Sequence, residues 1–119
     1  MPVQTPAIVT LSYDRDSTNQ IVVVVSPPVI QVSPGQVIRF ARSDSLPGTL
    51  RITFKDKDFF SCNNPHFHVD GAFHEGDGEV KVTSIPRRTT YACDLLDADG
   101  NRIGGSREDG GGAVEPERN

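Results

Sequence analysis

All three histidines of this chain fall within nine residues, between His66 and His74. His66 and His68 are two residues apart, so on a β-strand both imidazole rings would point to the same side. Asp70-Gly71 is typical of a two-residue hairpin turn, and in that register Glu75 lies opposite His66. Two imidazoles and one carboxylate form a ligand set that binds divalent transition metals. The segment therefore predicts a metal site at His66, His68 and Glu75, and the chain predicts no other cofactor.

The same segment has a second interpretation, as the solvated tip of a β-hairpin. In that case Glu75 pairs with His66 on a polar surface and holds no metal, because exposed pairs of this kind contribute little energy. His74 points to the other side of the hairpin in this register and is not expected to be a ligand. The residue types leave both interpretations open.

Few other residues are placed for catalysis. Cys62 lies four residues before His66, a spacing that permits a nucleophilic cysteine beside a general base. No Gly-x-Ser-x-Gly motif is present, and nothing in the sequence identifies an oxyanion hole. The sequence therefore favours a protein that is not an enzyme, with a metal-dependent enzyme as a further alternative.

Four residues could form a contact surface for another protein: Phe59, Phe60, Arg87 and Arg88. The two adjacent phenylalanines would make an apolar patch if both were exposed. The arginine pair follows Ile85-Pro86 at an expected turn, and a guanidinium can grip a carboxylate through its planar fork. The alternatives are core packing for the phenylalanines and a solvated turn for the arginines.

The composition narrows the class of protein. The chain has 119 residues, enough for one domain, with a net charge of −4 and a pI of about 5.2. An acidic chain is a poor match for a nucleic-acid binder, which needs cations to neutralise phosphates. No apolar run approaches the ~20 residues of a membrane span. Residues 1–6 lack the basic and apolar regions of a secretory signal, which predicts a cytoplasmic protein.

Strand signals recur along the chain, and no segment has the apolar period of a helix. The predicted strands are residues 7–13, 21–25, 29–32, 37–42, 50–54, 79–84 and 89–96. A hairpin around Asp99-Gly100 would place Asp97 opposite Arg102. Seven to nine short strands in roughly 100 residues predict an all-β fold, a sandwich or a barrel. Pairing should be antiparallel, because no helices are available as parallel crossovers.

The predicted domain covers residues 1–104. Residues 105–119 are rich in Gly and acidic side chains, with one Val and no aromatic residue. Such a segment cannot bury enough surface to offset the entropy of ordering it, so we expect a disordered tail.

Two stretches carry a family resemblance. Residues 32–40 (VSPGQVIRF) combine a valine, a Pro-Gly turn and an alternating strand that ends in Phe40, and residues 91–93 read Tyr-Ala-Cys. Both resemble cupredoxin-like domains, which implies an antiparallel Greek-key β-sandwich over roughly residues 20–104. Tyr-x-Cys is shared with immunoglobulin-like sandwiches, the alternative. That alternative lacks a Trp here, and Cys62 lies only 31 residues before Cys93.

The resemblance implies the fold without its copper chemistry. A blue-copper site needs a Cys thiolate, two imidazoles and usually a Met. Cys93 matches the position of the thiolate ligand, but no His follows His74 and the only Met is Met1. We therefore expect a small module without electron transfer that binds a protein or self-associates, as a homodimer, through a sheet edge. The alternative is a metal-binding protein that uses the histidine segment.

Overall fold

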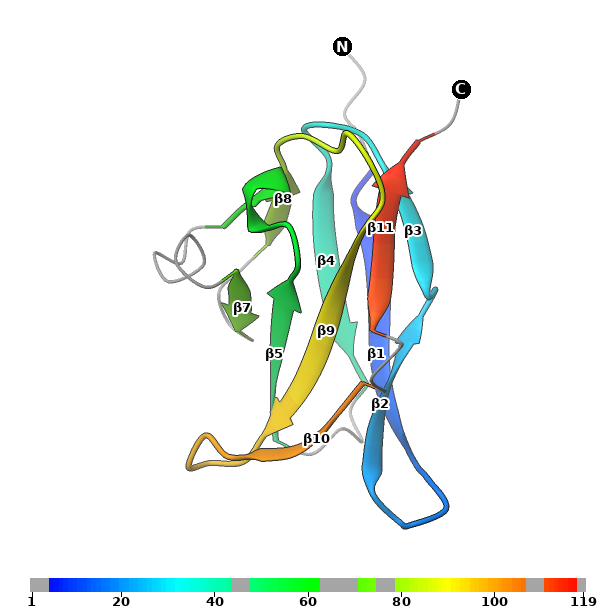
Figure 1. Cartoon of the computed structure of the whole chain (residues 1–119), viewed down its shortest axis with the longest axis vertical. Helices are drawn as coiled ribbons and strands as arrows, with labels where there is room; N and C mark the ends of the chain where they lie inside the picture. The colour runs from blue at the N-terminus through cyan, green and yellow to red at the C-terminus, as the bar shows by residue number, and fades with distance from the viewer. Residues whose placement is uncertain (1–4, 44–47, 63–70, 75–78, 107–110, 118–119) are drawn as a thin grey trace.

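The structure is a computed structural model, and it describes residues 5–43, 48–62, 71–74, 79–106 and 111–117 (Figure 1). These residues form an eleven-stranded mixed sheet, which confirms the predicted all-β class. The elements are β1 (Ala7–Arg15), β2 (Ile21–Ser26), β3 (Val29–Val32), β4 (Val37–Arg42), β5 (Thr49–Phe54), η1 (Lys57–Phe59), β6 (Phe60–Ser61), β7 (Ala72–His74), β8 (Val80–Val82), β9 (Thr89–Leu96), β10 (Arg102–Gly105) and β11 (Gly112–Pro116). In this part of the chain, no helix is long and apolar enough to cross a membrane.

All seven predicted strands are present, with ends within two residues of the expected ones. The sheet has eleven strands rather than seven to nine, because four further segments pair as well: β6, β7, β10 and β11. β7 and β10 lie in the two hairpins predicted from Asp70-Gly71 and Asp99-Gly100, whereas β6, with two residues, and β11, in the predicted tail, were not expected.

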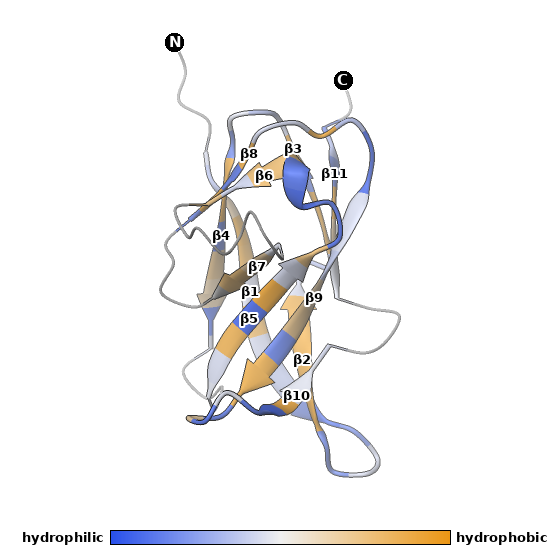
Figure 2. Cartoon of the chain, turned by 60° about the vertical axis from the view of Figure 1, so that its left-hand side comes forward, coloured by the Kyte–Doolittle hydropathy of each residue, from blue (hydrophilic) through white to orange (hydrophobic). Residues whose placement is uncertain are grey.

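The strands pair in two rows that are joined through β9 and β10 (Figures 1 and 2). One row is β7-β5-β9-β11-β3, and the other is β10-β2-β1-β4-β8-β6. The antiparallel pairing of β9 with β10 connects the rows at one end, so the structure counts as a single sheet.

Pairing is not purely antiparallel as expected, since β1–β4, β10–β2 and β11–β3 are parallel. No helical crossover is needed, because the chain reverses twice between β1 and β4, after residue 15 and at residues 33–36. Between these reversals it passes from β2 in one row to β3 in the other. The two reversals restore the direction of β1, so β4 arrives beside it in parallel.

The core lies between the two rows and collects the inward side chains of both. On β5, Leu50, Ile52 and Phe54 are buried, and the residues between them are partly exposed. Figure 2 shows this alternation of hydrophobic and hydrophilic residues along β5 and β9. Phe40 of the other row meets Phe54 and Tyr91 edge-on, with ring centroids 6.2 and 5.5 Å apart. Such edge-to-face contacts add to the burial of the rings and join the rows.

Two turns contrast in how well the sequence predicts them. At residues 33–36, the N–H of Gln36 donates to the carbonyl of Ser33 (3.1 Å), and Gly35 has a φ of 91°, as a type II turn requires. At the second turn the predicted pair of Asp97 with Arg102 is wrong, because Leu96 stands opposite Arg102.

The register of the second turn differs because its loop is one residue longer than predicted. The N–H of Asp97 donates to the carbonyl of Asn101 (2.8 Å), which leaves three residues in the loop. Asp97 Oδ1 accepts the N–H groups of Asp99 and Asn101, both at 2.9 Å. The carboxylate therefore organises the turn rather than pairing across it.

The predicted disordered tail is wrong for Gly112–Pro116, which form β11 between β9 and β3. Val114 is fully buried and Ala113 nearly so. The N–H of Ala113 donates to the carbonyl of Pro28 (2.9 Å), and that of Glu117 to the carbonyl of Val32 (3.0 Å). Because a strand paired on both edges satisfies its backbone, β11 needs little apolar surface of its own. The folded domain therefore extends past residue 104.

Glycine lets β11 lie close to its neighbour. A Cβ on Gly112 would overlap the phenol ring of Tyr91, and one on Gly111 would overlap the Tyr91 carbonyl. The same glycines that indicated a flexible tail in the sequence are therefore the residues that permit this close approach.

Val114→Ala tests whether β11 is part of the folded core. Removing two buried methyl groups should lower the free energy of unfolding by about 2 kcal/mol, measured by urea denaturation. Glu117→Ala, at an exposed position just after the strand, should change it by no more than about 0.5 kcal/mol. Equal effects of the two substitutions would contradict the placement of β11.

Candidate binding surface

The predicted metal ligands are not brought together by the part of the chain that the structure describes. His66, His68 and Glu75 lie outside the described residues, as does the strand expected before Asp70. The backbone of His74 belongs to β7 and stands opposite Arg51 of β5. Among the described residues, no group of three or more His, Cys, Asp or Glu side chains could hold a metal ion. The metal site remains a prediction from the sequence.

The predicted contact surface is only partly exposed. Phe60 is buried, and its ring centroid lies 4.4 Å from that of Phe54, so Phe60 belongs to the core and is wrong as a contact residue. Phe59 is half-buried and packs against the edge of the core. Arg88 is exposed. The alternative of core packing is therefore correct for one of the two phenylalanines.

Arg87 and Phe59 contact each other. The guanidinium carbon of Arg87 lies 5.0 Å from the centroid of the Phe59 ring, a cation–π geometry. Arg87 Nη2 also pairs with Asp56 Oδ1 (3.1 Å), and Asp56 Oδ2 accepts the hydroxyl proton of buried Thr89 (2.6 Å). These contacts tie the turn before β9 to the turn after β5, which gives Arg87 a structural role.

Both cysteines are buried free thiols. Burial raises the pKa of Cys93 to about 12, with a smaller contribution from the negative charge of Asp94. The neighbouring Tyr91 hydroxyl is also buried, and it has no hydrogen-bond partner within the described residues. Burial first, and then Cys93, raises its pKa above the usual range. Neither group is accessible or ionised near neutral pH, so neither can act there as a nucleophile.

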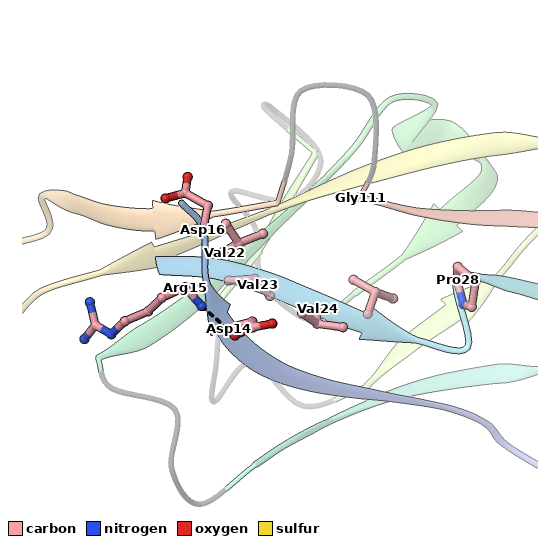
Figure 3. A pocket seen from close by; sticks show the side chains of 9 residues that line it. Asp14, Arg15, Asp16, Val22, Val23, Val24, Pro28 and Gly111 are labelled. Carbon is pink, nitrogen blue, oxygen red and sulfur yellow. Dashed lines mark hydrogen bonds between the residues drawn. The ribbon is translucent and has the colours of Figure 1, made fainter. Parts of the chain in front are cut away.

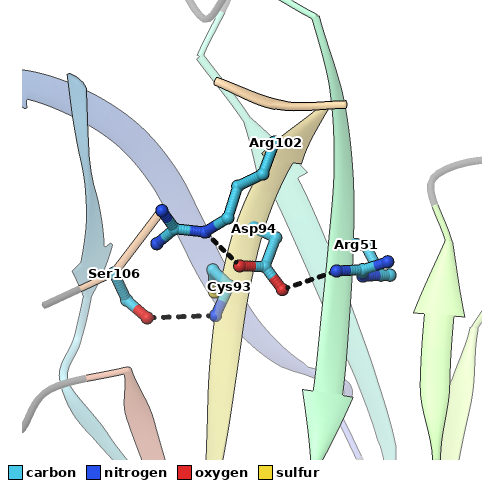
Figure 4. A network of polar contacts seen from close by, with 5 residues as sticks. All are labelled: Arg51, Cys93, Asp94, Arg102 and Ser106. Carbon is cyan, nitrogen blue, oxygen red and sulfur yellow. Dashed lines mark hydrogen bonds and ion pairs between the residues drawn. The ribbon is translucent and has the colours of Figure 1, made fainter. Parts of the chain in front are cut away.

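The strongest polar cluster joins three strands on the outer surface (Figure 4). Asp94 of β9 accepts from Arg51 Nη2 of β5 at 3.2 Å and from Arg102 Nε of β10 at 2.8 Å. A Cβ on Gly105 would overlap Arg102 Nη2, so the glycine lets the guanidinium lie flat across β10. One carboxylate between two guanidinium groups leaves one positive charge. The predicted partner of Arg102, Asp97, is wrong because the register of the hairpin differs from the expected one.

An open groove of about 350 Å³ follows β2, and we call it the β2 groove (Figure 3). It is lined by residues 22–25, Pro28, Gly111 and the charged residues 14–16. Val24 is 41% exposed, so the groove presents apolar surface to solvent. The sequence predicted a strand over residues 21–25, but the unbroken run of branched apolar residues gave no sign of this exposure.

The backbone of β2 is also incompletely paired. β1 pairs with β2 from Ile21 to Ser26, but β10 pairs only with Ile21 and Val22. Within the described residues, Val23–Ser26 therefore has a strand partner on one side only. A strand edge of this kind can accept an added strand from another chain.

Comparison with known proteins assigns no function to this surface. No protein-family model, no curated protein and no solved structure matches the chain.

Cys93 should resist alkylation while the protein is folded. At pH 8 its thiolate fraction is small and its side chain is inaccessible, so iodoacetamide should modify it only in denaturant, as read by peptide mass spectrometry. The raised pKa also has a consequence for stability. In the unfolded chain the Cys93 thiol has an ordinary pKa of about 8.5, so it ionises at a lower pH than in the folded protein. The free energy of unfolding should therefore fall as pH rises from about 8.5 toward 12. Rapid labelling of Cys93 in folded protein would contradict its burial.

The predicted metal site is tested by elemental analysis. With ligands at His66 and His68, the purified chain should retain about one equivalent of a divalent transition metal, and a His66→Ala/His68→Ala variant should lose it. His74→Ala is the matched control and should keep the metal. The absence of metal after incubation with Zn, Ni or Cu ions would eliminate the site.

Proposed function

We propose that the chain is a cupredoxin-like Greek-key β-sandwich without a blue-copper site. The two rows of strands with a shared core support a sandwich. The passage of the chain from β2 to β3, and from β10 to β11, supports it as well, since strands that switch sheets form the corners of such folds. The lack of any His after His74 supports a fold without electron transfer.

We further propose that this domain binds a protein partner at the β2 groove. The observation that carries the proposal is the coincidence of apolar exposure at Val24 with a backbone at Val23–Ser26 that, among the described residues, is paired on one side only. Exposed valine supplies apolar area, and the strand edge supplies directional hydrogen bonds. An extended peptide uses both when it adds to a sheet edge.

The position of the groove also favours strand addition over a flat contact. β10 already pairs in parallel with Ile21 and Val22 at one end of the strand. An added segment would continue this pairing along Val23–Ser26. Its alternate side chains would then face the apolar lining around Val24.

A charge at Val24 should abolish binding of extended peptides. Peptides selected from a random display library on the wild-type chain should bind Val24→Glu at least tenfold more weakly, because a carboxylate would be desolvated in the contact. Ile8→Glu is the matched control, since Ile8 is a 55% exposed apolar residue on the neighbouring strand β1 that does not line the groove. It should leave the affinity unchanged.

Two results would overturn the proposal: a selection that yields no binding peptide, or peptides that bind Val24→Glu as well as wild type. Sedimentation equilibrium of wild type and Val24→Glu separates a partner protein from a second copy of the chain. Concentration-dependent dimers that the substitution dissociates would identify self-association at the β2 groove.

A further inference from the structure

A second groove lies between the β1–β2 turn and β10, and its lining differs from that of the β2 groove. Its volume is about 820 Å³, within the usual range for small-molecule sites. Hydrogen-bond donors from separate segments line it: Arg15, Gln20, Arg102 and Ser106. We call it the donor groove.

Arg102 enters the donor groove in a fixed orientation. Its Nε donates to Asp94 Oδ1 at 2.8 Å, and its guanidinium lies over Gly105, where a Cβ would overlap Nη2. The bond to Asp94 uses only the Nε–H, and within the described residues the Nη groups have no acceptor. Because the bond at Nε already holds the guanidinium in place, a ligand that binds the Nη groups causes little further loss of side-chain entropy.

Arg15 is held in a similar way on the other side. Its Nη1 donates to the carbonyl of Asn19 at 3.0 Å, within the turn that joins β1 to β2. Asp16 is the acidic residue of the lining, and its Oδ1 accepts the N–H groups of Thr18 (2.9 Å) and Gln20 (3.0 Å). This carboxylate oxygen organises the turn that carries Asn19, the partner of Arg15.

Ser106 adds a neutral donor. Its Oγ accepts the N–H of Cys93 at 3.1 Å, and its own N–H donates to the Cys93 carbonyl at 2.8 Å. Because Oγ is already an acceptor on the β9 side, its hydroxyl proton is available to a group in the donor groove. Ser106 is thereby anchored at the point where β10 ends.

We propose that the donor groove binds the carboxylate group of an acidic ligand. Among the residues that line the groove, Arg15 and Arg102 are cationic and Asp16 is the one anionic residue, which leaves an excess of one positive charge in the lining. One carboxylate balances that charge, and the guanidinium fork matches its two oxygens. The carboxylate belongs to a small organic acid or to an acidic side chain of a peptide. The proposal does not depend on binding at the β2 groove.

The test is an NMR titration of the ¹⁵N-labelled full chain at constant ionic strength. The probes are propionate and the capped tripeptide acetyl-Gly-Glu-Gly-amide. Each should produce saturable shifts of the backbone amides of Gln20, Gly104, Gly105 and Ser106. Arg15→Gln and Arg102→Gln should each raise the Kd at least fivefold. A lower Kd for the tripeptide would assign the site to acidic peptides, and an equal Kd would assign it to small acids.

Arg39→Gln is the matched control. Arg39 is 54% exposed and paired with Glu79, against 56% for Arg102, and its substitution changes the net charge equally. It should leave the Kd within twofold of wild type. Arg15→Gln is the decisive variant, because the Arg15 side chain is exposed and its guanidinium bonds to the turn carbonyl of Asn19 rather than to a core side chain. Linear shifts, equal Kd values for wild type and Arg15→Gln, or equal weakening by Arg39→Gln would overturn the proposal.

Discussion

The two edges of β9 pair with different strands, and the rest of the structure depends on this arrangement. One edge pairs with β5 from Thr49 to Phe54, and the other is shared by β10 and β11. A strand has only two edges, so two neighbours on one edge must follow each other along it. Because β10 also pairs in parallel with β2 of the other row, this division links the two rows of strands. The inward face of β9 then contributes its buried side chains to the common core.

The same division exposes part of the molecule. β10 ends at Gly105 and β11 begins at Gly112, so among the described residues a gap separates the two strands on the edge of β9, at residues 92–93. Ser106 bonds to Cys93 at this gap, through both its N–H and its Oγ. On the facing row, Val23–Ser26 lies beyond the last residue paired with β10. The β2 groove is therefore a consequence of how the sheet is assembled, and not of a locally unusual sequence.

Charged side chains are also grouped in this region. Asp94 holds Arg51 and Arg102 on the outer surface, and the hairpin turn holds Arg15 on the far side of the donor groove. The chain is acidic overall, with a net charge of −4, yet the residues that line the donor groove carry an excess of one positive charge. Screening limits such an effect to about 8 Å at physiological salt, so the local excess, and not the net charge, governs what binds there.

The sequence by itself determined the all-β class, the seven main strands and the Pro-Gly turn at residues 33–36. Each of these follows from neighbouring residues, through alternation, β-branching and the backbone preferences of Gly and Pro. Tertiary structure alone decided that Gly112–Pro116 is a strand, that Arg102 pairs with Asp94, and that Phe60 is buried. These depend on which strands become neighbours and in which register, and a shift of one residue exchanges every partner. Local sequence patterns predict where a strand forms. Pairing between residues far apart in the chain decides which parts of that strand are exposed.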